Sequence, residues 1–208
     1  MRPLELARRC ARCGAGCDRA TAWGRTGEHF WGIGAHGITP DMMTFAKGLG
    51  NGFAIGGVVA RGELLDGIRG NGISTFGGNP IATAAGNATL DYVLSHDLQR
   101  NAAVTGELII SGLKEAAAQL NIIGEVRGRG LMFAVDLVDP ATGKASPPLA
   151  AKMLEATKER GLLVGKGGLY GHTLRMAPPL TLTEAEAKEG LTILTDALHA
   201  VNSEVTGK

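Results

Sequence analysis

A single lysine follows a short apolar run and precedes a glycine-rich turn. The run covers Met42–Ala46, Lys47 comes next, and glycines alternate with other residues at 48, 50 and 52. Glycine permits tight turns and close backbone approach, so we expect Lys47 where a buried strand ends and a loop begins. Partial burial disfavours the ammonium form, and a neutral amine can attack a carbonyl carbon to form a Schiff base. An ordinary solvated loop lysine is the alternative interpretation.

Two other segments place polar side chains where a small anion could bind. Ser74 and Thr75 precede a helix that Asn79 would cap and Pro80 would begin. Hydroxyls beside a helix N-terminus favour phosphate, although such residues also cap helices that bind nothing. Arg175 lies in a short apolar strand, where a buried guanidinium needs an anionic partner. A substrate carboxylate or an acid of the chain itself would serve.

The cysteines are confined to the N-terminus. They are Cys10, Cys13 and Cys17, and a fourth metal ligand would have to be Asp18 or His29. The second cysteine pair typical of zinc sites is missing, so we expect no metal and a poorly ordered N-terminus over residues 1–22. An odd number of cysteines favours a reducing compartment, and we expect a cytoplasmic protein without a secretory signal.

Composition excludes several classes of function. The 208 residues carry a net charge of +1, and 4% of them are aromatic, which argues against nucleic-acid binding. No apolar run reaches the roughly 20 residues that span a bilayer, so we expect no membrane segment. The 32 glycines are about twice the usual share and favour an α/β enzyme with many tight turns.

Hydrophobic patterning predicts alternating strands and helices, and therefore an α/β fold. We expect strands at 42–46, 53–60, 131–138, 161–164 and 173–176. We expect helices at 63–69, 81–95, 98–120, 147–160 and 184–201. Thr183 and Glu186 form a predicted capping box for the last helix. The domain boundary is predicted near 121–130, which gives one domain at 23–120 and a smaller one at 121–208.

Four segments together resemble the class III pyridoxal-phosphate-dependent aminotransferases. They are 44–52, 74–80, 126–132 and 174–180, which match in order and spacing as well as in residues. Residues 27–32 are similar to the alanine–glyoxylate aminotransferase-2-like branch. The resemblance covers about residue 23 to the C-terminus. It implies fold type I, with part of the cofactor-binding large domain at 23–120 and a small C-terminal α/β domain at 121–208.

The resemblance also implies roles for individual residues. Lys47 matches the lysine that forms a Schiff base with pyridoxal 5'-phosphate and moves the proton of the substrate Cα. Ser74 and Thr75 match the pair that contacts the phosphate of the neighbouring subunit's cofactor, which implies a homodimer. Arg175 matches the arginine that binds the substrate α-carboxylate. The implied reaction transfers an amino group between an amino acid and a 2-oxo acid such as glyoxylate or pyruvate.

Before residue 23 the sequence departs from this pattern. The family's chains are longer, and the preceding part supplies half of the cofactor site. The family's aspartate, which pairs with the pyridine nitrogen, is matched by Cys17, while Asp18 falls one residue later and would point to the opposite face of a strand. A truncated, catalytically inactive fragment of such an enzyme is therefore the alternative hypothesis. A fragment of this kind should expose sheet edges and apolar faces.

Overall fold

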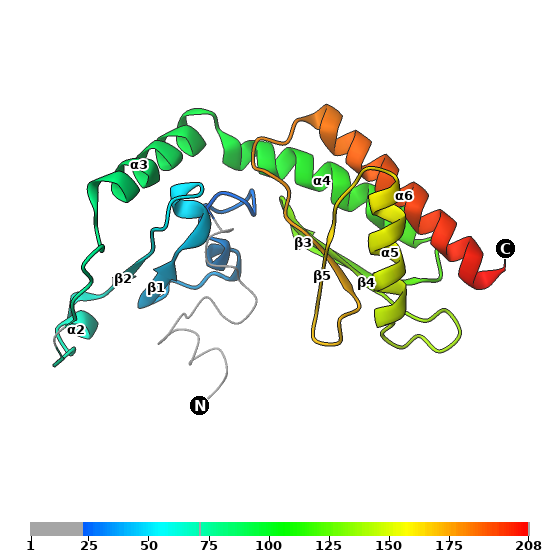
Figure 1. Cartoon of the computed structure of the whole chain (residues 1–208), viewed down its shortest axis with the longest axis horizontal. Helices are drawn as coiled ribbons and strands as arrows, with labels where there is room; N and C mark the ends of the chain where they lie inside the picture. Colours follow the sequence, from blue (N-terminus) through cyan, green and yellow to red (C-terminus); the bar gives the residue numbers. More distant parts are fainter. Residues whose placement is uncertain (1–22, 71, 208) are drawn as a thin grey trace. The chain divides into compact units, whose positions relative to one another are not determined.

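The computed structural model describes residues 23–70 and 72–207, which form two compact units (Figure 1). The first unit contains the described residues among 23–24 and 29–99, and the second contains 25–28 and 100–207. The sequence predicted a boundary near 121–130, whereas the contacts divide the chain between Gln99 and Arg100, within helix α4 (Leu98–Ala117). The difference arises because the buried side chains of α4, such as Ile110 and Leu113, belong to the core of the second unit.

The first unit is built on a pair of short antiparallel strands. Its elements are η1 (Gly32–His36), β1 (Met42–Phe45), η2 (Lys47–Gly50), β2 (Gly57–Ala60), α2 (Gly62–Leu65) and α3 (Pro80–Ser95). The prediction that both strands are buried is wrong. β1 is half-buried throughout, and the side chains of Val58 and Val59 in β2 are 51% and 58% exposed. Neighbouring residues of a strand point to opposite faces, so both faces of β2 are uncovered, as expected for a partial domain.

Helix α3 begins where local sequence signals predicted. The Asn79 side chain accepts a hydrogen bond from the Ala82 backbone nitrogen at 2.9 Å, and Pro80 is the first helical residue. The helix packs on η2 through Gly86, where a Cβ would lie 3.3 Å from Ile55 Cδ1. This packing gives the loop after β1 a fixed support.

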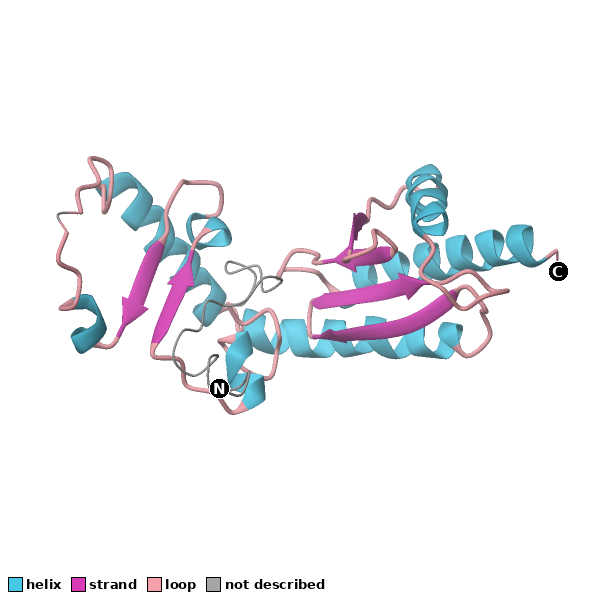
Figure 2. Cartoon of the chain, turned by 90° about the horizontal axis from the view of Figure 1, so that it is seen from below, coloured by secondary structure: helices cyan, strands magenta, loops and turns pink. Residues whose placement is uncertain are grey.

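The second unit is a four-stranded antiparallel sheet with helices on one face. Its elements are α4, β3 (Ile123–Arg129), β4 (Met132–Leu137), α5 (Pro147–Glu159), β5 (Gly165–Gly167), β6 (Thr173–Met176) and α6 (Glu184–Thr206). The strand order is β3-β4-β6-β5, and α4 and α6 lie behind the sheet in Figure 2. Along β4, Phe133, Val135 and Leu137 are buried and join the helices in one core. The residues between them face the other side of the sheet.

Two predicted boundaries in this unit can be compared directly with the structure. The capping box is confirmed, because the Glu186 backbone nitrogen donates to Thr183 Oγ1 at 3.2 Å and the Glu186 carboxylate accepts from the Thr183 backbone nitrogen at 2.8 Å. The strand predicted at 161–164 is wrong. Gly161 takes a left-handed conformation with φ 87° after α5, and pairing with β6 starts only at Gly165. Within the described residues no helix is long and apolar enough to cross a membrane.

On the face of the sheet away from the helices, hydrogen bonds and ion pairs form a network around the Asp136 carboxylate. Thr173 Oγ1 donates to its carboxylate at 2.5 Å, Arg127 forms an ion pair with it, and His172 Nε2 lies 3.8 Å away. Arg127 also contacts Glu125 at 3.1 Å. Desolvation raises the pKa of Asp136, but the hydrogen bonds from Arg127 and Thr173 outweigh it, so the pKa lies below its ordinary value.

We predict that Asp136 stabilises the fold in a pH-dependent way. A depressed folded-state pKa means that the contribution is fully present above the unfolded value of about 4 and is lost as pH falls through the lower folded-state value. Asp136→Asn should lower the free energy of unfolding by about 1–2 kcal/mol at pH 7. The gap to the wild type should shrink towards pH 2. Urea unfolding across this range measures it, and a gap that is constant with pH would contradict the prediction.

Lys47 gives a second stability prediction. It has φ 60°, a left-handed conformation that costs a residue with a Cβ about 1–2 kcal/mol. Lys47→Gly and Lys47→Ala both remove the amine, so their difference reports the backbone alone. We expect the glycine variant to be more stable by about 0.5–1 kcal/mol after its greater unfolded-state entropy is included. Denaturant titration of both variants provides the measurement, and an alanine variant of equal or higher stability would disprove the strain.

Candidate functional site

Lys47 and Ser74 line the same cavity in the first unit. The cavity has a volume of about 490 Å³, within the range of small-molecule sites. Thr75 is not among its lining residues. The cavity is formed by Ala46, Lys47, Phe53, Ala54, Ile55, Gly56, Ser74, Phe76, Gly77, Gly78, Asn79 and Ala82. The structure therefore brings together two of the residues that the sequence marked for chemistry, although they are separated by a strand and a helix along the chain.

The end of β1 that leads to Lys47 is held by aromatic packing. The rings of Phe45 and Trp31 lie 6.5 Å apart, and Trp31 in turn packs edge-on against Phe30 at 5.1 Å. Opposite Phe45 in the sheet is Gly57, where a Cβ would come within 2.7 Å of the Phe45 ring. The glycine thus makes room for the ring, and the ring fixes the strand two residues before Lys47.

The turn after Lys47 confirms the predicted role of the glycines. Leu49 and Gly50 are buried, and a Cβ on Gly50 would lie 2.8 Å from Ile55 Cγ2. Lys47 itself is exposed, so the expectation of a lysine held partly out of water is wrong for the described residues. Among the described residues, the cavity is lined by segments of the first unit, and Lys47 is its exposed lysine.

The segment before α3 contributes a hydroxyl to the cavity, and two positions of the helix start have no free backbone N–H. The Gly77 backbone nitrogen donates to the Ser74 carbonyl at 3.2 Å and closes a turn that presents Ser74. Pro80 has no N–H, and the Ala82 N–H is already bound by the Asn79 side chain. These two positions therefore offer an anion no backbone donor, and the Ser74 hydroxyl supplies a polar group to the cavity.

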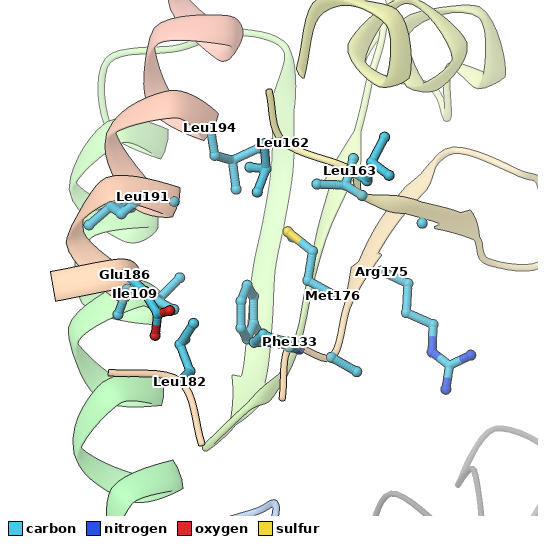
Figure 3. Close-up of a pocket in the computed structure, with 16 residues that line it drawn as sticks. Ile109, Phe133, Leu162, Leu163, Arg175, Met176, Leu182, Glu186, Leu191 and Leu194 are labelled. Carbon is cyan, nitrogen blue, oxygen red and sulfur yellow. The ribbon is translucent and has the colours of Figure 1, made fainter. Parts of the chain in front are cut away.

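Arg175 lies in the second unit and lines a different cavity, of about 330 Å³. Its strand neighbours are Ala134 of β4 and Gly165 of β5. Figure 3 shows that the Arg175 side chain extends away from the apolar side chains of that cavity, including Phe133 and Met176. The expectation of a buried guanidinium is wrong, because Arg175 is exposed between two buried residues of β6.

The sequence analysis missed two residues that hold the segment after Arg175. Arg25 donates to the backbone carbonyl of Pro178, 153 residues away, and Asn101 donates to Leu180, 79 residues away. Neither contact has a local signature, since both depend on the tertiary fold.

The possible metal site cannot be assigned to described residues. Cys10, Cys13, Cys17 and Asp18 lie outside the part of the chain that the structure describes, whereas His29 lies within it. Among the described residues, no group of three or more histidines, cysteines, aspartates and glutamates could hold a metal ion.

Comparison with known proteins connects these features. Residues 19–198 match the family model for class III aminotransferases. Alanine–glyoxylate aminotransferase 2 homolog 2 of Arabidopsis thaliana is 42% identical over 80% of this chain and 35% of its own length. An alanine/serine racemase of Pyrococcus horikoshii is 36% identical over 90% of this chain and 39% of its own length. The chain thus spans well under half of the curated relatives that it matches.

Solved structures show the same relation. A phospholyase from Arthrobacter in complex with phosphoethanolamine superposes with a TM-score of 0.84 at 35% identity, over 88% of this chain and 44% of that one. A transaminase from the marine bacterium Virgibacillus superposes with a TM-score of 0.80 at 30% identity, over 90% and 45%. The mixed α/β architecture is accordingly that of a partial fold type I transferase. From the family match and these relatives together, the chain belongs to the class III aminotransferases.

Proposed function

We propose that this chain is part of an enzyme that transfers an amino group between an amino acid and a 2-oxo acid such as glyoxylate or pyruvate. The observation that carries the proposal is the shared cavity of Lys47 and Ser74 in a chain of this family. The racemase and the phospholyase among the similar proteins are named for other activities, so the reaction type rests on the family match and on Lys47.

The cavity residues fit pyridoxal 5'-phosphate at two of its ends. An amine at Lys47 suits the aldehyde, and a hydroxyl at Ser74 suits the phosphate, within one cavity of adequate volume. No carboxylate is among the described lining residues, and Cys17, which matches the family's aspartate, lies outside the described part of the chain. When bound, the cofactor supplies an electron sink for charge that develops at the substrate Cα.

Each of the candidate residues of this chain would then have a separate role. The Lys47 amine would hold the cofactor at its aldehyde and would accept and return the proton of the substrate Cα, as a positioned base does. The resemblance assigns both Ser74 and Thr75 to the phosphate of the neighbouring subunit's cofactor. Because Ser74 lines the cavity of its own Lys47, we depart from it and place Ser74 at the phosphate within one subunit, while Thr75, which does not line that cavity, would serve the neighbouring subunit of a homodimer. Arg175 would bind the substrate carboxylate through its planar fork of donors. A cytoplasmic location completes the proposal.

The exposed faces of the first unit favour a second candidate, a catalytically inactive fragment. Val58, Val59 and Ile73 are at least half exposed, and the chain spans 35% to 45% of the proteins that it resembles. A cavity with so few walls could bind the cofactor without orienting it. The two candidates differ in whether a chain that binds the cofactor at Lys47 also converts an amino donor.

A labelling experiment tests the proposal. Purified chain is mixed with pyridoxal phosphate, reduced with borohydride, digested and mapped by mass spectrometry. We expect Lys47 to be modified in preference to the exposed lysines Lys144 and Lys166. Ser74→Ala should reduce Lys47 labelling several-fold because the phosphate loses a donor. Ser111→Ala is the matched control, since its hydroxyl donates to Glu107 at 2.7 Å in the second unit.

The outcomes separate the candidates. Label spread evenly over the lysines would contradict an assembled cofactor site. Selective label on Lys47, together with pyruvate release from L-alanine in a single turnover of unreduced chain mixed with pyridoxal phosphate, supports the aminotransferase. Selective label without pyruvate supports the inactive fragment.

A further inference from the structure

We propose that Arg25 and Asn101 are positioning residues that fix the main chain around Arg175. The inference rests on the proposed function, in which Arg175 binds the substrate carboxylate. Its basis is that two side chains from distant parts of the chain donate to backbone carbonyls of the coil that follows β6.

Arg25 ties together the ends of two paired strands. Its Nη1 donates to the carbonyl of Leu131, just before β4, at 3.3 Å and to the carbonyl of Pro178, just after β6. The β4–β6 pairing ends at the pair Phe133 and Met176, so these carbonyls lie beyond the last ladder position. The guanidinium therefore closes the ladder where backbone hydrogen bonds stop, three residues after Arg175.

Asn101 holds the next part of the same coil. Its Nδ2 donates to the carbonyl of Leu180 at 2.7 Å and to that of Leu182 at 2.9 Å. Asn101 lies near the start of α4, which is anchored in the core through residues such as Leu113. Asn101 thus connects the coil to a helix that is packed in the core.

The backbone of Arg25 is itself fixed by close packing against the segment before β4. The Leu131 backbone nitrogen donates to the Arg25 carbonyl at 2.9 Å, and Glu28 forms an ion pair with Arg129 at 2.7 Å. At Gly130 a Cβ would lie 2.3 Å from the Arg25 carbonyl oxygen, so these two segments of the chain touch through their backbones. Because its backbone is fixed in this way, Arg25 can place its guanidinium at a defined position.

The neighbours of Arg175 explain why its main chain must be held. Ala134 and Gly165 flank it in the sheet, and its side chain leaves β6 on the exposed face. The point from which the guanidinium reaches a carboxylate is therefore set by the backbone of β6. At the other end of β6, Thr173 is fixed by its 2.5 Å hydrogen bond to Asp136, which leaves Arg25 and Asn101 to hold the C-terminal end.

Hydrogen exchange is the first test. Arg25→Met should accelerate amide exchange in a peptide covering 173–182 by about tenfold, since removing the clamp lowers the free energy of local opening. Arg25→Lys should be intermediate, because an ammonium keeps the charge and the donors but carries them on a more flexible stem than the planar guanidinium. Asn101→Ala should act in the same direction and is the milder variant if Arg25→Met folds poorly. Arg160→Met is the control, since Arg160 also donates to a backbone carbonyl, that of Ala156, at 2.8 Å.

Carboxylate binding is the second readout, which a merely structural role would not move. The arginine Nε–H signals of labelled chain are followed as L-alanine is added, with the Arg175 signal identified by its loss in Arg175→Lys. We expect Arg25→Met to weaken L-alanine binding about tenfold, as a small misplacement of a binding group does. Arg25→Lys should restore part of the affinity.

The results distinguish failure of the inference from failure of the proposed function. Unchanged exchange over 173–182 in both Arg25→Met and Asn101→Ala overturns the inference, even if Arg175→Lys abolishes L-alanine binding. Faster exchange with unchanged L-alanine affinity also overturns it, because the clamp would then be structural only. If Arg175→Lys leaves L-alanine binding intact, the proposed role of Arg175 fails, and the positioning role fails with it.

Discussion

The pairing of β4 with β6 is the constraint on which the second unit depends. It joins residues 132–137 to residues 173–176 in register, with Val135 opposite Leu174 and Asp136 opposite Thr173. Because strand residues alternate between faces, this register buries Phe133, Leu174 and Met176 under the helices and sends Arg175 and Asp136 to the other side. A slip of one residue would bury the arginine and expose the core. The apolar layer therefore decides where the polar groups point.

The first unit has no comparable apolar layer in its described part. Its buried hydrophobic side chains are confined to Leu49, Ala82, Val93 and Leu98, while many larger ones are exposed. Two-stranded sheets are marginal unless another layer covers them. The local geometry of Lys47 is nevertheless well defined, because it depends on short-range contacts of Phe45, Gly50 and Ile55. The backbone position of this lysine is thus set by nearby residues, whereas burial of its side chain would need a further layer of structure.

Features that depend on neighbouring residues could be predicted from the sequence. Asn79 with Pro80, and Thr183 with Glu186, are capping signals complete within four residues, and both helices begin where they indicate. The apolar run 162–164 was misassigned because half-buried Leu162 and Val164, which line a cavity on either side of the exposed Leu163, give the same hydrophobic pattern as a paired strand. The left-handed backbone of Lys47 has no sequence signal, since glycine and not lysine usually marks that conformation. The contacts of Arg25 could not be foreseen because no periodicity extends over 153 residues.

Three glycines that bring main chains together make part of this protein intolerant of gradual change. A Cβ on Gly106 would lie 2.2 Å from the carbonyl carbon of Gly130, and one on Gly27 would lie 2.6 Å from the Cα of Ala103. The obstructing atoms belong to the backbone, so no rotation of a side chain can relieve the clash. Alanine is therefore nearly as disruptive there as any larger residue, and the usual relation between substituent volume and damage disappears. Sequence drift around this crossing must proceed by other positions, while these three stay fixed together.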